Sequence, residues 1–308
     1  MALLIDRTRS LLFPPPAVGH WSSVVAQEEY EDAYWELLSA LPAPTSRHID
    51  TGHGSAHVLL WESDNPAPPV LLLPGHSSGA PMWAENLPDF IGHRTVIAAD
   101  PFGDAGLSSQ RLPLNSPVDQ ATWISQLLTE LGMPRVHVVG HSFGGATAAV
   151  FALRRPGQVA SLTLLEPVMV IEPPPLSTYF WASLLLLPVP QSWKDRALAA
   201  IGGSTVEAVR EGGPMTRMVD AAASGYVTAM PTPSRLSDEQ WRSLTMPVRI
   251  DIAGTGSLAG GPGAVDRMTA LLPNAETRFW PEATHSLPME VRAELDPQLV
   301  EFWRHHDR

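Results

Sequence analysis

The residues best placed to do chemistry surround one serine, in the run Gly140-His141-Ser142-Phe143-Gly144. The apolar run VHVV precedes it, and the helix-like stretch ATAAVFALRR follows it. A G-x-S-x-G pattern between a strand and a helix exposes the serine hydroxyl as a nucleophile, and the glycines let strand and helix approach. An incidental serine in a glycine-rich turn is the alternative, which the flanking strand and helix disfavour. We therefore expect Ser142 to attack a carbonyl carbon.

The segments that must position this serine alternate between strands and helices. Continuous apolar runs, typical of strands buried on both faces, occupy residues 69–75, 95–100, 136–141, 160–166 and 248–254. Amphipathic stretches separate these runs, and two shorter alternating runs before them, HIDTG and AHVLLW, predict a hairpin. A helix is expected earlier, over 27–40, after an irregular proline-rich arm. Strands that alternate with helices predict a mostly parallel sheet that is covered on both faces.

Several segments resemble the α/β-hydrolase superfamily, over most of residues 45–305. LLLPGHSSGAPMW resembles its oxyanion loop, AADPFGDAGLSS the loop after its fourth strand, and PNAETRFWPEATHSLPME its last strand and catalytic-histidine loop. The resemblance implies an α/β fold with an eight-stranded, mostly parallel sheet, helices on both faces and a helical cap insertion. We expect a core over 1–170 and 246–308, with an N-terminal arm over 1–45, and a cap over 171–245.

The resemblance also implies a histidine base for the serine, because a serine hydroxyl is a weak nucleophile until a base takes its proton. His285 lies in the segment that resembles the catalytic-histidine loop. The other candidates are His305 and His306 in the terminal tail and His141 inside the serine turn. We expect His285 to be the base.

The acid departs from the usual pattern of the superfamily. The acid usually follows the strand at 248–254 in a G-x-x-D arrangement, but here Gly254-Thr255-Gly256-Ser257 carries a serine at that place. Some α/β-hydrolases carry the acid after the preceding strand, where this chain has Glu166. Glu166 is the favoured candidate, Asp251 the second and Asp266 the third, and a site without an acid remains open.

By the same resemblance, two backbone N–H groups form the oxyanion hole. They belong to Phe143, which follows the nucleophile, and to His76, which follows Pro74-Gly75. Most relatives have a histidine where Pro74 stands, so the anchoring of this loop is expected to differ here. The side chain of His76 is not expected to be catalytic.

The strand pattern vanishes between Pro167 and about Thr245, where proline-rich turns and short helical segments predict the cap. The apolar run 176–187 is too short to span a bilayer and is expected to be a cap helix. A cap over the sheet edge would turn apolar side chains toward a substrate, although packing in the cap's own core is equally expected. The candidate substrate-binding residues are Trp83, Phe180, Trp181, Met215 and Met218.

Composition excludes several classes of function. The net charge of -12 and the single lysine, Lys194, disfavour nucleic-acid binding, which needs clustered basic residues. The chain has no cysteine, so thiolate chemistry and disulfides are excluded. No metal-binding spacing is present, and no metal or other cofactor is expected. Charges at Asp6, Arg7 and Arg9 interrupt any N-terminal apolar run, so a cytoplasmic protein without a membrane span is expected.

These observations favour a serine hydrolase that cleaves a carboxylic ester or lactone with an apolar acyl or ring portion through an acyl-enzyme. An acyltransferase or a C–C bond hydrolase would use the same residues. The alternative without catalysis is a ligand-binding protein that kept the fold, which the serine at position 257 supports. The expected partner is a small ester or lactone, and the sequence leaves a homodimer open.

Overall fold

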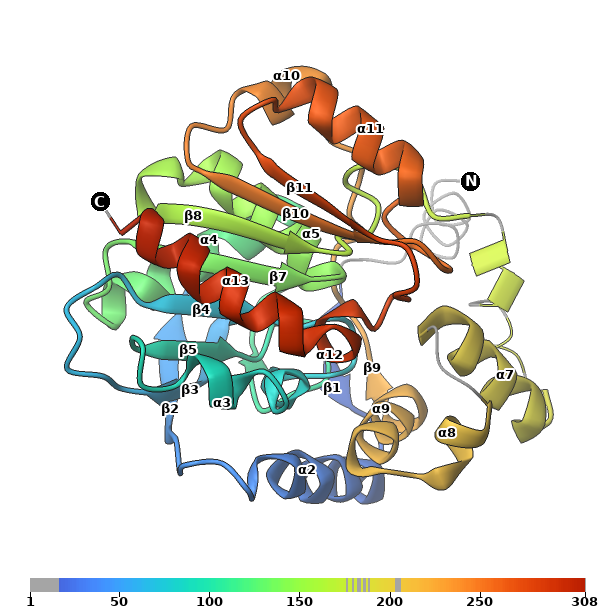
Figure 1. Ribbon diagram of the computed structural model, residues 1–308. Helices are drawn as coiled ribbons and strands as arrows, with labels where there is room; N and C mark the ends of the chain where they lie inside the picture. Colours follow the sequence, from blue (N-terminus) through green and yellow to red (C-terminus); the bar gives the residue numbers. More distant parts are fainter. Residues whose placement is uncertain are drawn as a thin grey trace, which may run out of the picture.

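The computed structural model describes residues 17–307, except 176, 179, 182, 183, 185, 186, 188 and 203–205. A nine-stranded sheet crosses the molecule in the order β11-β10-β8-β7-β4-β5-β3-β2, with β6 paired to β3 (Figure 1). Its strands are β2 (Thr45–Thr51), β3 (Gly54–Trp61), β4 (Val70–Leu73), β5 (Val96–Ala99), β6 (Ser109–Gln110), β7 (Val136–His141), β8 (Val159–Leu165), β10 (Val248–Ala253) and β11 (Glu276–Trp280).

The central strands β4, β5, β7, β8 and β10 are buried along their whole length, as their uninterrupted apolar sequences require. The six strands from β11 to β5 pair in parallel, whereas β3 pairs antiparallel with β5 and with β2. The expected α/β class and mostly parallel sheet are confirmed. Eight strands follow one another in the sheet order, and the two-residue β6 adds the ninth.

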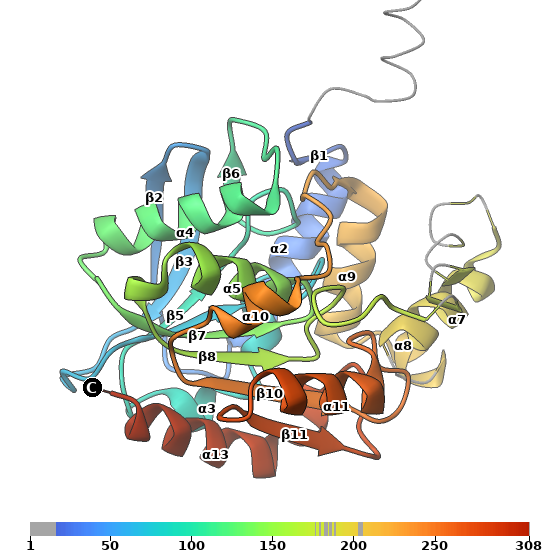
Figure 2. The same cartoon turned by 90° about the horizontal axis from the view of Figure 1, so that it is seen from above.

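Helices cover both faces of the sheet (Figure 2). One face carries α4 (Pro117–Glu130), α5 (Phe143–Arg154) and α11 (Gly261–Leu271), whose side chains pack in one hydrophobic cluster. The other face carries α3 (Leu87–Phe90) and α13 (Arg292–His305), and they pack in a second cluster. Three short helical elements lie in the connections: η1 (Ala80–Trp83) after β4, η2 (Pro156–Gln158) before β8 and α12 (Leu287–Glu290) before α13.

The chain between β8 and β10 forms a helical insertion, most of which lies beyond the carboxyl ends of the parallel strands, whereas its last helix lies beside α11 (Figure 1). It contains α7 (Gln191–Gly202), α8 (Val206–Glu211), α9 (Pro214–Gly225), β9 (Tyr226–Val227) and α10 (Asp238–Arg242). The helix expected over 176–187 falls partly outside the described residues. Leu236 and Trp241 are buried in the same hydrophobic cluster as the side chains of α4, α5 and α11. The last part of the expected cap therefore packs with the core.

The N-terminal segment is tied to this insertion. Strand β1 (His20–Trp21) pairs antiparallel with β9, and Ser22 N donates to Gly225 O at 2.7 Å. Helix α2 (Val24–Leu38), expected over 27–40, packs on α9, where a Cβ on Gly225 would lie 2.2 Å from the Cβ of Ala26. The expected irregular arm is therefore ordered from His20, and its residues 1–16 lie outside the described part of the chain.

The C-terminal segment is held to the core by the side chain of Asp307. The carboxylate of Asp307 lies 2.7 Å from the guanidinium of Arg94 and 3.0 Å from Nε2 of His137. Both basic side chains are buried, and the guanidinium also lies over the ring of Trp303, 5.6 Å from its centroid. Within the described residues, no helix combines the length and apolar character that crossing a bilayer requires.

Candidate active site

Ser142 lies at the turn between β7 and α5, with φ 54° and ψ −118°. This left-handed conformation is strained for a residue with a side chain. The turn is tight enough that a Cβ on Gly140 would lie 2.3 Å from Gly144 O, and a Cβ on Gly144 would lie 2.2 Å from Leu73 O. The two glycines therefore allow the turn that lifts the serine to the edge of the sheet.

The structure brings the three expected catalytic side chains together. Nε2 of His285 lies 2.9 Å from Oγ of Ser142, and Nδ1 of His285 lies 3.2 Å from Oε2 of Glu166. All three residues are buried. A hydroxyl, an imidazole and a carboxylate in this order can move a proton off the serine and stabilise the imidazolium that results.

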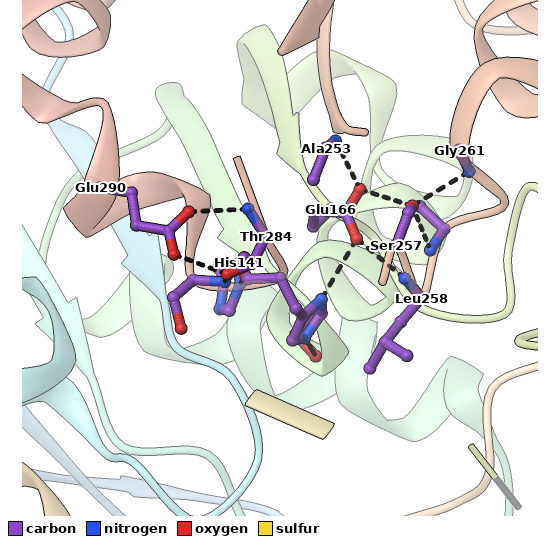
Figure 3. A network of polar contacts seen from close by, with 12 residues as sticks. His141, Glu166, Ala253, Ser257, Leu258, Gly261, Thr284 and Glu290 are labelled. Carbon is purple, nitrogen blue, oxygen red and sulfur yellow. Dashed lines mark hydrogen bonds and ion pairs between the residues drawn. The ribbon is translucent and has the colours of Figure 1, made fainter. Parts of the chain in front are cut away.

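Glu166 directly follows β8, and its backbone has φ 47°. Its carboxylate also accepts hydrogen bonds from Ala253 N and Ser257 Oγ, both at 2.8 Å, and from Leu258 N at 3.0 Å (Figure 3). These three donors come from the end of β10 and the loop after it. The loop after β10, where the superfamily pattern places the acid, therefore holds the carboxylate of Glu166, which follows the neighbouring strand β8.

The other two candidate acids lie in different surroundings. Asp251 is buried on β10, where both its oxygens accept hydrogen bonds from the guanidinium of Arg249, at 2.8 and 3.0 Å, and Trp280 Nε1 donates to it at 2.9 Å. Asp266 is exposed on α11. The structure brings neither carboxylate to His285, so the geometry favours Glu166 as the acid.

The loop that carries His285 is held from two sides, which sequence reasoning missed. Nε2 of His141 donates to the backbone carbonyl of His285 at 2.8 Å. Burial, then the neighbouring imidazole of His285, lowers the pKa of His141 to about 3, so its ring is neutral. On the other side Glu290 accepts hydrogen bonds from N and Oγ1 of Thr284, at 2.7 and 2.6 Å (Figure 3).

The two expected oxyanion donors belong to adjoining segments. Phe143 is the first residue of α5, so its N–H has no acceptor within the helix. The rings of Phe143 and His76 lie 5.3 Å apart. A Cβ on Gly75 would lie 3.4 Å from the Cβ of Ser142, which places the oxyanion loop directly against the nucleophile. These contacts fit a hole formed by both backbone N–H groups, which remains a prediction.

Buried aspartates from the loop after β5 anchor the oxyanion loop. Asp104 accepts a hydrogen bond from Ser77 N at 2.8 Å and lies 3.1 Å from Nδ1 of His76. Burial lowers the pKa of His76, but the adjacent carboxylate of Asp104 outweighs it and the pKa is raised. Asp100 accepts a hydrogen bond from Ala80 N at 2.7 Å. The segment AADPFGDAG contains both acids, but its pattern did not reveal their partners.

The expected substrate-binding residues divide into two groups. Trp83 and Met218 have no exposed surface and pack in the hydrophobic cluster with Tyr30 and Tyr34, so they belong to the core and not to an open pocket wall. Phe180, Trp181 and Met215 retain exposed surface, and the rings of the first two form an edge-to-face pair 5.2 Å apart. Of the five candidates, these three keep surface that a substrate could reach.

Within the described part of the chain, no group of three or more histidine, cysteine, aspartate or glutamate side chains is arranged to hold a metal ion. The buried carboxylates of the site are occupied by protein donors instead.

Comparison with known proteins gives a family match and relatives that align over most of the chain. The family described as alpha/beta hydrolase fold matches residues 68–203. The carboxylesterase nap of Bacillus subtilis is 25% identical over 279 residues, which cover 89% of this chain and 92% of that protein. Carboxylesterase YbfK of the same organism is 22% identical, over 92% of this chain and 96% of that protein. The crystal structure of naproxen esterase from Bacillus subtilis superimposes with a TM-score of 0.80 at 25% identity, covering 90% of this chain and 97% of that one.

Proposed function

We propose that this chain, which belongs to the α/β-hydrolase superfamily, is a carboxylesterase that cleaves small apolar esters through an acyl-enzyme on Ser142. The observation that carries this proposal is the continuous hydrogen-bonded order from Ser142 through His285 to Glu166. The likeness to two bacterial carboxylesterases over nine-tenths of the chain supports the same reaction.

In the first half of the reaction, Oγ of Ser142 attacks the ester carbonyl carbon while Nε2 of His285 takes the hydroxyl proton. The negative charge that forms on the carbonyl oxygen faces the N–H groups of Phe143 and His76. When the carbonyl reforms, the bond to the alcohol oxygen breaks and His285 gives its proton to that oxygen. The alcohol leaves, and the acyl group stays bound to Ser142.

In the second half, a water molecule attacks the acyl carbon and gives its proton to His285. The bond to Oγ then breaks, Ser142 takes the proton back, and the carboxylic acid leaves. A lactone would open by the same steps, with its alcohol still attached to the acyl group. Glu166 carries its charge beside Nδ1 throughout and so stabilises the imidazolium in both halves.

Apolar substrates are proposed because the expected substrate-binding side chains that keep exposed surface, Phe180, Trp181 and Met215, are aromatic or methionine. Phe180 is 55% exposed, and it pairs with Trp181. Among the described residues of this region, Arg210 and Arg217 are engaged by Asp195 and Glu36. These contacts leave neither guanidinium free to select a charged acyl group.

A fluorophosphonate probe and a series of p-nitrophenyl esters of increasing chain length test the proposal. Wild type is expected to be labelled and to hydrolyse the esters, and Ser142→Ala is expected to do neither while keeping its unfolding transition. Folded wild type that is neither labelled nor active would instead support a ligand-binding protein. A panel of lactones, and ester assays with added alcohols, separate ester hydrolysis from lactone opening and acyl transfer.

A further inference from the structure

We propose that Ser257 is a positioning residue that holds the carboxylate of Glu166 directed at His285. The inference rests on the proposed function, because it assigns a role within the same triad. Ser257 lies in the loop after β10, and it is buried beside Glu166 (Figure 3). Its Oγ lies 2.8 Å from Oε1 of Glu166.

The direction of this hydrogen bond follows from the other partners of the hydroxyl. A serine hydroxyl has one proton to donate and two lone pairs that accept. Ala259 N donates to Oγ of Ser257 at 3.2 Å, and Gly261 N donates at 3.0 Å. Both lone pairs are therefore used by backbone N–H groups at the start of α11, and the hydroxyl proton is left for Glu166.

Each oxygen of Glu166 consequently accepts two hydrogen bonds. Oε1 accepts from Ala253 N and from Ser257, and Oε2 accepts from Leu258 N and from Nδ1 of His285. Ala253 N, Leu258 N and the hydroxyl of Ser257 all donate to this carboxylate and hold it in place beside Nδ1 of His285. Of the two side-chain donors, His285 is the partner in catalysis, so Ser257 is the one whose removal tests this arrangement.

The loop after β10 thus still serves the triad, although it carries no carboxylate. It supplies the N–H of Leu258 and the hydroxyl of Ser257, and the hydroxyl links Glu166 to the first turn of α11. A hydrogen bond to a charged group contributes about 1.5–3 kcal/mol, which corresponds to roughly a 10- to 100-fold change in rate if it is spent on the imidazolium.

The test compares Ser257→Ala with wild type and with Thr255→Ala. Thr255 offers a matched control because its hydroxyl lies in the same loop, is exposed and has only Pro281 O as a partner, at 3.5 Å. Ser257→Ala is expected to lower kcat for a p-nitrophenyl ester by about 10- to 100-fold with KM within a factor of about two. Thr255→Ala is expected to match wild type. Ser257→Cys would introduce the single thiol of the chain, keeps a weaker hydrogen-bond donor at this position, and is expected to fall between wild type and Ser257→Ala.

Proton NMR supplies a reading that does not depend on turnover. The Nδ1–H of His285 in wild type is expected as a far-downfield resonance, which Thr255→Ala retains and which Ser257→Ala broadens or moves upfield. An unchanged resonance and an unchanged kcat in folded Ser257→Ala would overturn the proposal. Wild type that hydrolyses no ester would contradict the proposed function, and the resonance would still decide the role of Ser257.

Discussion

Glu166 occupies a position that is unfavourable for folding. Its φ of 47° is in the left-handed region, which costs on the order of 1–3 kcal/mol for a residue with a side chain. Its carboxylate has no exposed surface, so it has exchanged water for four hydrogen bonds from the protein. Ser142 shares the left-handed backbone. Strain of this kind persists where the surrounding structure fixes it, which is typical of catalytic sites.

Glu166→Gln is expected to lower kcat by about 10³- to 10⁴-fold, because an amide at this position can orient the imidazole but cannot stabilise its charged form. The measurement is kcat and KM for a p-nitrophenyl ester, together with fluorophosphonate labelling. KM is expected to change little, since Glu166 has no part in holding the ester.

Asp251→Asn provides the matched comparison on the neighbouring strand. Here the loss is expected in stability, because the buried guanidinium of Arg249 would lose its buried charged partner and keep only the more distant, half-exposed Glu276 at 3.6 Å. Breaking such a buried pair costs about 3–5 kcal/mol, to be measured by urea denaturation. The reverse pattern, in which Asp251→Asn loses more activity than Glu166→Gln, would contradict the assignment of the acid.

Asp104→Asn is expected to lower kcat by about 10-fold or more, because the hydrogen bond that positions the oxyanion loop loses its charge. The same change is expected to lower the pKa of His76, since the carboxylate is what raises it. Histidine titration by NMR measures this pKa. Asp50→Asn, which alters an exposed pair with Arg111, serves as the control and should leave both quantities unchanged.

At the scale of elements, the strands of the core were predictable from sequence. Each of the continuous apolar runs became a strand, because a strand buried on both faces needs apolar side chains at every position. The serine turn was predictable for a similar reason, since Gly140 and Gly144 have no room for a Cβ. The hydrogen bonds of Ser257 and Asp104 could not be predicted, because the sequence of a short loop does not indicate which distant atoms its side chains contact.

The contact between α13 and the loop before α3 predicts a pH dependence of stability. Asp296 is buried, and its burial raises its pKa to about 7 despite hydrogen bonds from Asn86. The folded chain therefore binds more protons at this group than the unfolded chain between about pH 4 and 7. The contribution of Asp296 therefore lowers the free energy of unfolding progressively as the pH rises from about 4 to 7.

Asp296→Asn is expected to remove this slope and to raise the free energy of unfolding at pH 8, on the order of 2 kcal/mol. Asn86 Oδ1 has no partner among the described residues and is available to accept a hydrogen bond from the new amide. Urea denaturation of both proteins at pH 5 and pH 8 measures the difference. An equal slope in the two proteins would contradict the raised pKa.

At the scale of the whole molecule, the C-terminal segment is expected to be essential for stability. Asp307→Ala leaves the guanidinium of Arg94, which is 1% exposed, without an acidic partner. A loss of about 2 kcal/mol or more in the free energy of unfolding is expected, toward the range for broken buried pairs. Glu301→Ala removes an exposed pair with Arg304 and should cost under about 1 kcal/mol. Equal effects of the two changes would refute this role.

The arrangement of the insertion is the part of the molecule that sequence could not predict. Its helices were expected from the loss of the strand pattern, but the pairing of β1 with β9 joins residues about two hundred positions apart. Two-residue strands carry no periodicity that a sequence reveals. The close fit of Gly225 against Ala26 likewise depends on which helices meet, and either residue alone is unremarkable in sequence.

This pairing ties α2, the first helix of the described part of the chain, to the insertion between β8 and β10. Should α9 swing away to admit an ester, α2 would have to travel with it, or the ribbon between β1 and β9 would have to come apart. Any movement of α9 is thereby coupled to a segment that contributes none of the catalytic groups. Substitutions in β1 or α2 would then change the rates of substrate binding and product release and leave the rate of the chemical step unchanged.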